Sequence, residues 1–214
     1  MRRSLVVSLA LLAIVRSQAV AQACMGMASY SAGPVQVAGH GSLTDGINSF
    51  GASVGYGLPS SVFGNVGIAT TSYDGADAAL DVGADVGYQM QIGKAQICPV
   101  ASFGVGSGPD SDDAGLNSSS RSASLSLAIG TAFGTSRMQI VPAVALGVEN
   151  TKLKVESSLG DFEGSDTHGL AQASVGLVFN SNITVRPSVS IPLGLTGSEP
   201  TVGLSVGFNF GQKR

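Results

Sequence analysis

The chain is poor in charged residues and contains no tryptophan. Only 12% of its 214 residues are Asp, Glu, Lys or Arg, and its formal net charge is −3. The lack of a basic footprint argues against nucleic-acid binding. Low charge combined with a positive mean hydropathy argues against intrinsic disorder, which requires the opposite composition. The length predicts one domain, or at most two.

The chain also lacks an apolar run long enough for a transmembrane helix. The stretch from Leu5 to Val15 is too short, since crossing a bilayer takes about 20 residues. Two arginines precede it and Ala21–Gln22–Ala23 follows it, which is the pattern of a cleaved signal peptide over residues 1–23. The mature chain then begins with a periplasmic tail over residues 24–34, and an uncleaved helix is the alternative.

From residue 35 onward, apolar residues recur at every second position, which is the period of a β-strand. In the stretch LDVGADVGYQMQI, residues 80–92, an apolar set alternates with a set of Asp, Gly and Gln. The last segment of the chain repeats this alternation. The pattern predicts about ten strands, near residues 35–42, 49–58, 63–73, 78–92, 95–107, 121–134, 136–149, 168–180, 182–193 and 200–210.

The second face of these strands consists mainly of Gly, Ser and Ala, with a few Asp, Asn and Gln. In a soluble sandwich that face would meet water and carry Lys, Glu and Arg. A closed barrel explains the inversion if apolar residues point to lipid and small polar residues fill a narrow lumen. Closure also pairs every backbone group, as a bilayer requires. We therefore predict an all-β fold over residues 35–214: a closed antiparallel up-and-down transmembrane β-barrel of about ten strands, with eight as the alternative.

Connections and aromatic residues agree with this orientation. Tight periplasmic turns are predicted at Gly93–Lys94, Gly134–Thr135 and Asn180–Asn182, and long outer loops at residues 108–119 and 150–167, where charged residues concentrate. Each strand that descends toward the periplasm carries an aromatic residue near its lower end. These residues predict an interfacial girdle: Tyr56, Tyr88, Phe133, Phe179, Phe208 and Phe210.

The final segment, TVGLSVGFNF, carries a family resemblance. With the signal peptide and the alternating strands, the chain resembles the small outer-membrane β-barrel proteins of Gram-negative-type bacteria, the opacity-protein-like group of eight to ten strands. In that group the barrel-assembly machinery reads a signal in the last strand. The resemblance assigns this signal to Thr201, Gly203, Val206, Phe208 and Phe210. It also implies a bacterial outer-membrane location, contact with outer-membrane lipid and lipopolysaccharide, and a monomer.

Motifs for catalysis are weak. GxSxG occurs at residues 51–55 and 203–207, but both matches fall inside predicted strands, whereas a nucleophile elbow needs a strand-to-helix turn. His40 and His168 lack the three or four ligands that a metal site uses, so they are expected to line the lumen or to be exposed.

A possible cation loop is also weak. Asp110, Asp112 and Asp113 have the spacing of calcium ligands, but Arg121 stands where a bidentate Glu should close the loop. A solvated acidic loop is the preferred interpretation. We predict no metal site and no cofactor.

Five residues are expected inside the barrel or across its mouth. Alternation predicts Asp81, Asp85 and Arg186 on lumen faces, where the arginine should meet a carboxylate. Cys98 should point into the lower lumen, within reach of the tail that begins at Cys24, because an extended chain covers about 3.3 Å per residue. In an oxidising compartment these thiols predict a disulfide that pins the tail across the periplasmic mouth, with lipid modification of Cys24 as the alternative.

These observations predict an integral outer-membrane barrel without catalytic activity. Its role would be structural or at the cell surface, with at most a narrow pore, because ten strands enclose far less space than the 16 to 18 strands of an open porin. The alternatives are a secreted soluble β-sandwich that acts as an adhesin, and an outer-membrane barrel enzyme.

Overall fold

The computed structural model describes residues 24, 35–58, 60–73, 78–108, 117–135, 137–157, 160–180, 182–195 and 199–210. No helix within these ranges is long and apolar enough to cross a membrane. The predicted signal peptide, the rest of the periplasmic tail and the acidic loop with Asp110, Asp112 and Asp113 lie outside the described residues.

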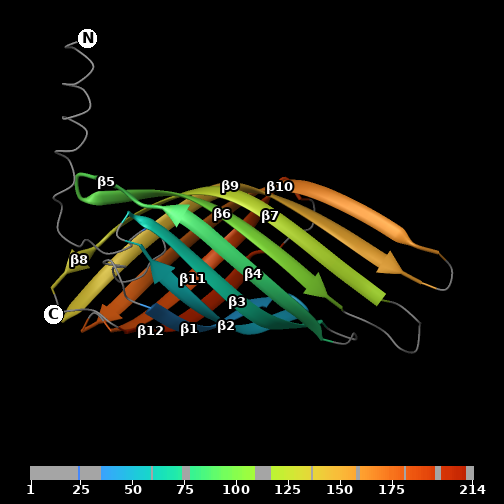
Figure 1. Ribbon diagram of the computed structural model, residues 1–214, viewed down its shortest axis with the longest axis horizontal. Coiled ribbons are helices and arrows are strands. Elements are labelled where there is room, and N and C mark those ends of the chain that lie inside the picture. The colour runs from blue at the N-terminus through green and yellow to red at the C-terminus, as the bar shows by residue number, and fades with distance from the viewer. Residues whose placement is uncertain are drawn as a thin grey trace, which may run out of the picture.

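The described residues form antiparallel strands that follow one another around a barrel (Figure 1). The strands are β1 (Val35–Thr44), β2 (Ile47–Gly57), β3 (Val62–Tyr73), β4 (Ala79–Tyr88), β5 (Met90–Ile92), β6 (Ala95–Ser107), β7 (Asn117–Thr131), β8 (Phe133–Gly134), β9 (Met138–Glu156), β10 (Phe162–Phe179), β11 (Ile183–Leu193) and β12 (Thr201–Phe210).

Strand pairing closes the ring. The first strand pairs with the last, from Val35 opposite Phe210 to Leu43 opposite Val202, and β9 pairs with β10 over the full length of β10. The short strand β5 continues β4 beside β6, and β8 continues β7 beside β9, so the ring has ten strands. The prediction of a closed antiparallel barrel is confirmed with ten strands, and the sandwich alternative is wrong because the barrel has no open edge between its first and last strands.

The apolar residues of the alternating pattern point outward. Leu125 and Phe103 are 66% and 67% exposed, and on β4 the side chains of Leu80, Val82 and Val86 are exposed in the same way. The six predicted girdle aromatics are between 37% and 57% exposed and lie near the strand ends at which the periplasmic turns are found. The outer surface is therefore an apolar band with aromatic rings at its periplasmic border.

Two predicted strands are each divided in two. Residues 78–92 form β4 and β5 with a break at Gln89, whose backbone N–H donates instead to the carbonyl oxygen of Ser61 at 2.9 Å. Residues 121–134 form β7 and β8 with a break at Ala132. Near the periplasmic rim, among the described strands, β5 pairs only with β6, and β8 pairs only with β9. The strand assignment is therefore interrupted at both places, although inward and outward residues still alternate.

The predicted connections on the outer side need two corrections. Asp45 and Gly46 alone connect β1 and β2, so the first outer connection is a tight turn and not a longer loop. The predicted loop over residues 150–167 is mostly a β-hairpin, because β9 continues to Glu156 and β10 begins at Phe162. This hairpin extends beyond the neighbouring strands at the outer end (Figure 1).

Candidate functional site in the barrel lumen

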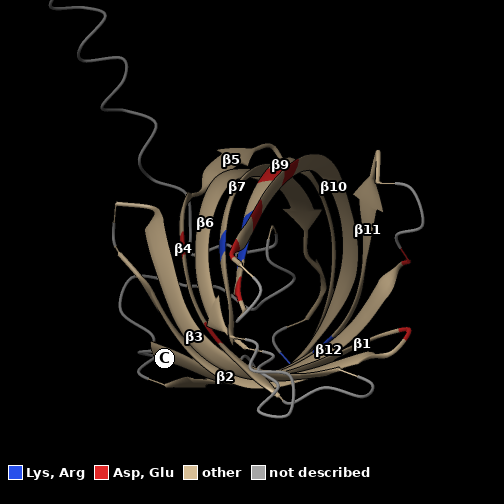
Figure 2. Cartoon of the chain, turned by 90° about the vertical axis from the view of Figure 1, so that its right-hand side faces the viewer, with Lys and Arg blue, Asp and Glu red and all other residues tan. Residues whose placement is uncertain are grey.

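The inward faces of the strands enclose two adjoining cavities of about 530 Å³ and 400 Å³. Figure 2 shows the barrel from its outer end. Serine hydroxyl groups are frequent on the wall, and on β7 serine occupies every second position from Ser118 to Ser126. The larger cavity is lined by Ser42, Ser53, Ser120, Ser122, Ser188 and Ser205.

The three predicted lumen charges line the larger cavity. Asp81 and Asp85 lie on β4, and Arg186 lies on β11. In the ring, β12, β1, β2 and β3 separate these strands on one side, and β6, β7, β9 and β10 separate them on the other. The carboxylates and the guanidinium therefore occupy opposite walls.

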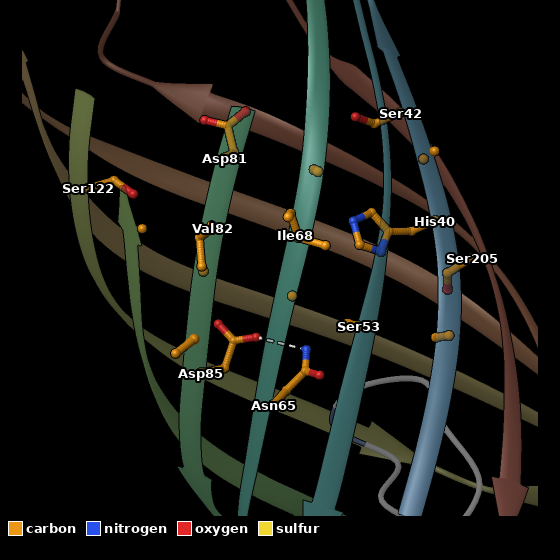
Figure 3. A pocket seen from close by; sticks show the side chains of 18 of the residues that line it. His40, Ser42, Ser53, Asn65, Ile68, Asp81, Val82, Asp85, Ser122 and Ser205 are labelled. Atoms are coloured by element: carbon orange, nitrogen blue, oxygen red, sulfur yellow. Dashed lines mark hydrogen bonds between the residues drawn. The ribbon is translucent and has the colours of Figure 1, made fainter. Parts of the chain in front are cut away.

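Each charged group bonds to a polar side chain on its own side of the lumen. Asn65 donates from Nδ2 to Asp85 Oδ2 at 3.3 Å (Figure 3). Thr71 donates from Oγ1 to Asp81 Oδ2 at 2.7 Å. Across the lumen, Arg186 Nε lies 3.3 Å from Ser205 Oγ. The contact expected between Arg186 and a carboxylate stays a prediction.

His40 also lines the larger cavity, from β1 (Figure 3). Its imidazole lies against Gly51 of β2, where an added Cβ would overlap Nε2. The two GxSxG matches place Ser53 and Ser205 in the middle of β2 and β12, facing the same cavity and not at a strand-to-helix turn. The geometry of a nucleophile elbow is thus missing at both serines.

Buried side chains gather in the periplasmic part of the lumen. Cys24 and Cys98 form a disulfide, and both residues are buried, at 4% and 0% exposed. They pack with Phe63, Val100 and Ala128 in one apolar cluster. Among the described residues, every buried side chain except those of Thr71 and Ala79 belongs to the periplasmic half of the barrel. We call the cluster of Cys24, Phe63, Cys98, Val100 and Ala128 the plug.

The ring of Phe63 has space in the plug because the facing residue is a glycine. Phe63 of β3 lies directly opposite Gly87 of β4 in the strand register, and a Cβ added to Gly87 would overlap the ring. Phe63 is only 4% exposed, unlike the outward aromatics of the girdle. The sequence pattern could have revealed that Phe63 points inward. Side chains two positions apart on a strand share a face, and Phe63 is two positions from Asn65, which lines the lumen, whereas Val66 points outward.

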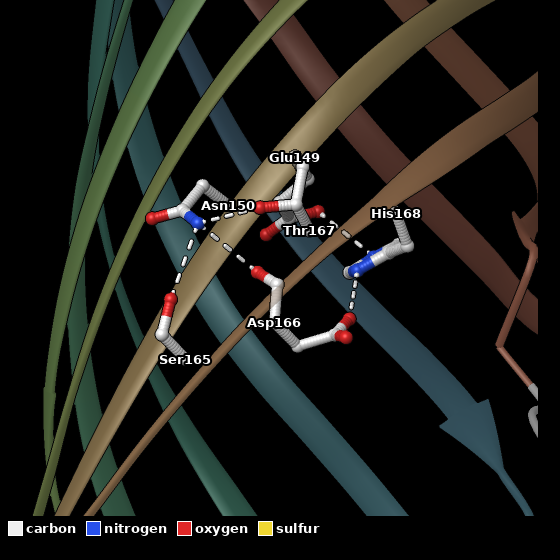
Figure 4. A network of polar contacts seen from close by, with 6 residues as sticks. All are labelled: Glu149, Asn150, Ser165, Asp166, Thr167 and His168. Atoms are coloured by element: carbon white, nitrogen blue, oxygen red, sulfur yellow. Dashed lines mark hydrogen bonds and ion pairs between the residues drawn. The ribbon is translucent and has the colours of Figure 1, made fainter.

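Near the outer end, His168 lies between two carboxylates. Its Nδ1 is 3.1 Å from Asp166 Oδ2, and its Nε2 is 3.9 Å from Glu149 Oε2 (Figure 4). A hydrolase would need a nucleophile beside such a histidine. The nearby Ser165 has the opposite parity on β10, and its Oγ accepts from Asn150 Nδ2 at 3.4 Å. No cluster of metal-ligating residues occurs in the part of the chain that the structure describes.

The residues of the predicted assembly signal lie on β12, between β11 and β1. Val206, Phe208 and Phe210 point outward, whereas Thr201 has the opposite parity and its hydroxyl lies 2.6 Å from that of Thr44. The predicted signal thus combines an outward apolar series with inward polar and small residues.

No protein-family model matches the chain, and no curated protein sequence matches it. Among solved structures, the chain is similar to the N-terminal β-barrel domain of Pseudomonas aeruginosa OprF, with 19% identity over 84% of this chain and 98% of that one and a TM-score of 0.42. It is also similar to Ail, the attachment invasion locus protein of Yersinia pestis, with 13% identity, coverage of 84% and 99% and a TM-score of 0.43. A third similar structure is the β domain of the Bordetella autotransporter BrkA, with 12% identity, coverage of 84% and 99% and a TM-score of 0.44.

These structures are small outer-membrane β-barrels, the class that the sequence resembles. The assignment of the fold rests on the chain itself: ten antiparallel strands closed into a ring, with apolar side chains outside and hydroxyl groups inside. The protein is therefore a small barrel of the outer-membrane type.

Proposed function

We propose that the protein is an integral β-barrel of the bacterial outer membrane, without catalytic activity, and that its lumen is a cup and not a conducting pore. The plug carries this proposal, because it fills the periplasmic part of the lumen with apolar side chains and a buried disulfide. The outer part of the lumen is hydrated and lined by hydroxyl groups. Its physical role is then structural, or the presentation of outer loops at the cell surface.

The outward face supports the membrane part of the proposal. A tilted β-strand needs about 9–11 residues to cross a bilayer, and β1, β4 and β12 each contain 10. The outward residues of β9 remain apolar up to Val148 and become polar from Asn150 onward. This change supports an outer border of the hydrocarbon near Val148, with the hairpin beyond it in water.

The proposal includes two partners and a monomeric state. The outward series Val206, Phe208 and Phe210 would be read by the barrel-assembly machinery, and outer-membrane lipid, including lipopolysaccharide, would surround the band. Closure of the ring leaves no strand pairing open between β1 and β12, so the barrel can insert as a monomer.

Conductance measurements test the cup. We expect the oxidised protein in a planar bilayer to give no steady conductance, and the Cys24→Ser/Cys98→Ser variant to give at most brief openings. A steady conductance from the oxidised wild type would show that the plug does not close the lumen. Slower gel migration after boiling and partition into detergent are expected for both proteins, and release into buffer would contradict the membrane location.

A further inference from the structure

Three cations at the outer end of the barrel are grouped on two adjacent strands. They are Arg121 on β7 and Lys152 and Lys154 on β9. The other described cations lie elsewhere: Lys94 and Arg137 next to the periplasmic turns, and Arg186 in the lumen.

Arg121 and Lys152 form a pair. They are directly opposite each other in the register of β7 and β9, and both are exposed. Arg121 has the parity of Leu125 and Leu127, and Lys152 has the parity of Leu146, so both side chains point outward. Side chains that are directly opposite have Cβ atoms about 5 Å apart, and like charges at this distance destabilise a sheet.

The nearby carboxylates act mainly on Lys154: Glu163 lies directly opposite it on β10, and Glu163 and Asp161 both raise the pKa of Lys154. Glu156 pairs with Lys154, and this hydrogen bond raises the pKa of the lysine. None of the ion pairs recorded within the described ranges includes Arg121 or Lys152. Asp166 follows Ser165, the residue of β10 that faces Lys152. Its side chain points into the barrel, where it contacts His168. An external anion would therefore remove an unfavourable interaction.

The level of Arg121 and Lys152 along the barrel axis indicates which kind of anion they would bind. On β9, Lys152 comes two positions after Asn150, at the level where the outward face changes from apolar to polar. Asn150 Nδ2 donates to Thr167 Oγ1 at 2.8 Å, and Lys152 faces Ser165 in the register, so hydroxyl and amide groups adjoin the cations on this face. Phosphate groups of outer-leaflet lipid lie at this level, directly above the hydrocarbon.

We infer that Arg121 and Lys152 form a binding site for the phosphate groups of an outer-leaflet lipid. This inference rests on the proposed membrane location. The guanidinium and the ammonium would share one phosphate, with Asn150, Ser165 and Thr167 beside it to receive polar groups of the headgroup. Lys154, which Glu156 neutralises, would have a secondary role. Each Lys or Arg near an anionic lipid surface contributes a factor of about five in affinity, so the pair contributes a factor of about 25.

Lipid binding to the full protein in detergent tests the inference. Native mass spectrometry would give the apparent Kd for bis-phosphorylated lipid A and for the same glycolipid after dephosphorylation. The test variant is Arg121→Gln/Lys152→Gln. The matched control is Arg137→Gln/Lys94→Gln, which removes the same two residue types at the periplasmic end. We expect the test variant to bind lipid A about 25-fold more weakly than the wild type at low salt, and the control to bind unchanged. Dephosphorylation should weaken binding to the wild type to the same degree.

Three results would overturn the inference. Equal affinity of the test variant and the control would show that the pair is not the site. Displacement of lipid A by millimolar inorganic phosphate would indicate a general anion site. A lower unfolding temperature of the test variant in lipid-free detergent would show that the cations serve a contact within the chain. Failure of the wild type to partition into detergent would contradict the proposed membrane location. This result is independent of the lipid-binding measurement.

Discussion

The contact between Phe63 and Gly87 allows a quantitative test of the plug. An added Cβ at Gly87 would overlap the Phe63 ring, so Gly87→Ala must displace a side chain that is only 4% exposed. Overpacking of this kind costs about 1–3 kcal/mol. We expect Gly87→Ala to lower the free energy of unfolding by that amount.

The double variant separates a steric cause from a backbone effect. Phe63→Ala alone removes the ring and should cost about 3–5 kcal/mol, the usual range for a buried phenylalanine. In Phe63→Ala/Gly87→Ala the new methyl group enters the space that the ring has left. The double variant should therefore lose no more than Phe63→Ala alone, which gives a coupling energy of about 1–3 kcal/mol.

Urea unfolding of the barrel in lipid vesicles, followed by the loss of heat-modifiable gel migration, measures these free energies. Gly83→Ala is the matched control, because Gly83 shares β4 and the inward parity of Gly87, but its added Cβ would meet only a backbone oxygen at 3.4 Å. We expect a small effect there. If the losses at Phe63 and Gly87 simply add, or if Gly83→Ala costs as much as Gly87→Ala, the steric explanation of the plug is refuted.

Three further changes have expected magnitudes in the same assay. Reduction of the disulfide, which joins residues 74 positions apart, should lower the free energy of unfolding by about 4 kcal/mol; an unchanged midpoint would contradict this. Leu127→Arg, in the middle of the outward band, should cost about 2–4 kcal/mol, whereas Ser119→Arg on the same face above the band should cost about 0–1 kcal/mol. Thr71→Val removes the 2.7 Å hydrogen bond to Asp81 and should cost about 1.5–3 kcal/mol; an unchanged free energy of unfolding would contradict this.

The barrel itself could be predicted from the sequence because each strand carries two signals at once. Leu125 and Leu127 are apolar at lipid positions, and Ser124 and Ser126 are small at lumen positions, so only one assignment of faces satisfies both. A two-residue turn such as Gly93–Lys94, where Gly93 has φ of 61°, then fixes the register of its hairpin.

The hairpin at the outer end was predicted as a loop because its polarity changes above the hydrocarbon. Up to Val148 the outward residues of β9 are apolar, but Asn150, Lys152 and Lys154 point outward into water. Inward residues Thr151 and Leu153 still alternate with outward residues, but two of those outward residues are now charged. A membrane strand that continues into water therefore looks like the beginning of a polar loop when only hydrophobicity is followed.

The plug could be predicted only in part. The disulfide followed from the position of Cys98 above a periplasmic turn and from the reach of the chain after Cys24. The packing of Phe63 on Gly87 did not follow, because their opposition depends on the register between β3 and β4. A one-residue shift in that register would pair the ring with a neighbour of opposite parity.

The lumen shows why a barrel of this size needs such a plug. Small residues such as Ser126 and Gly147 line the smaller of the two cavities and leave room for water there, because they do not reach across the lumen. Charged residues could close the space, but Asp85 and Arg186 bond on opposite walls. Apolar closure avoids the desolvation of buried charge, and a disulfide can bring a segment from outside the barrel wall into the remaining volume. Cys24 is held in that volume by its disulfide to Cys98, so the proposed cup would be closed at one end without a larger residue at every strand.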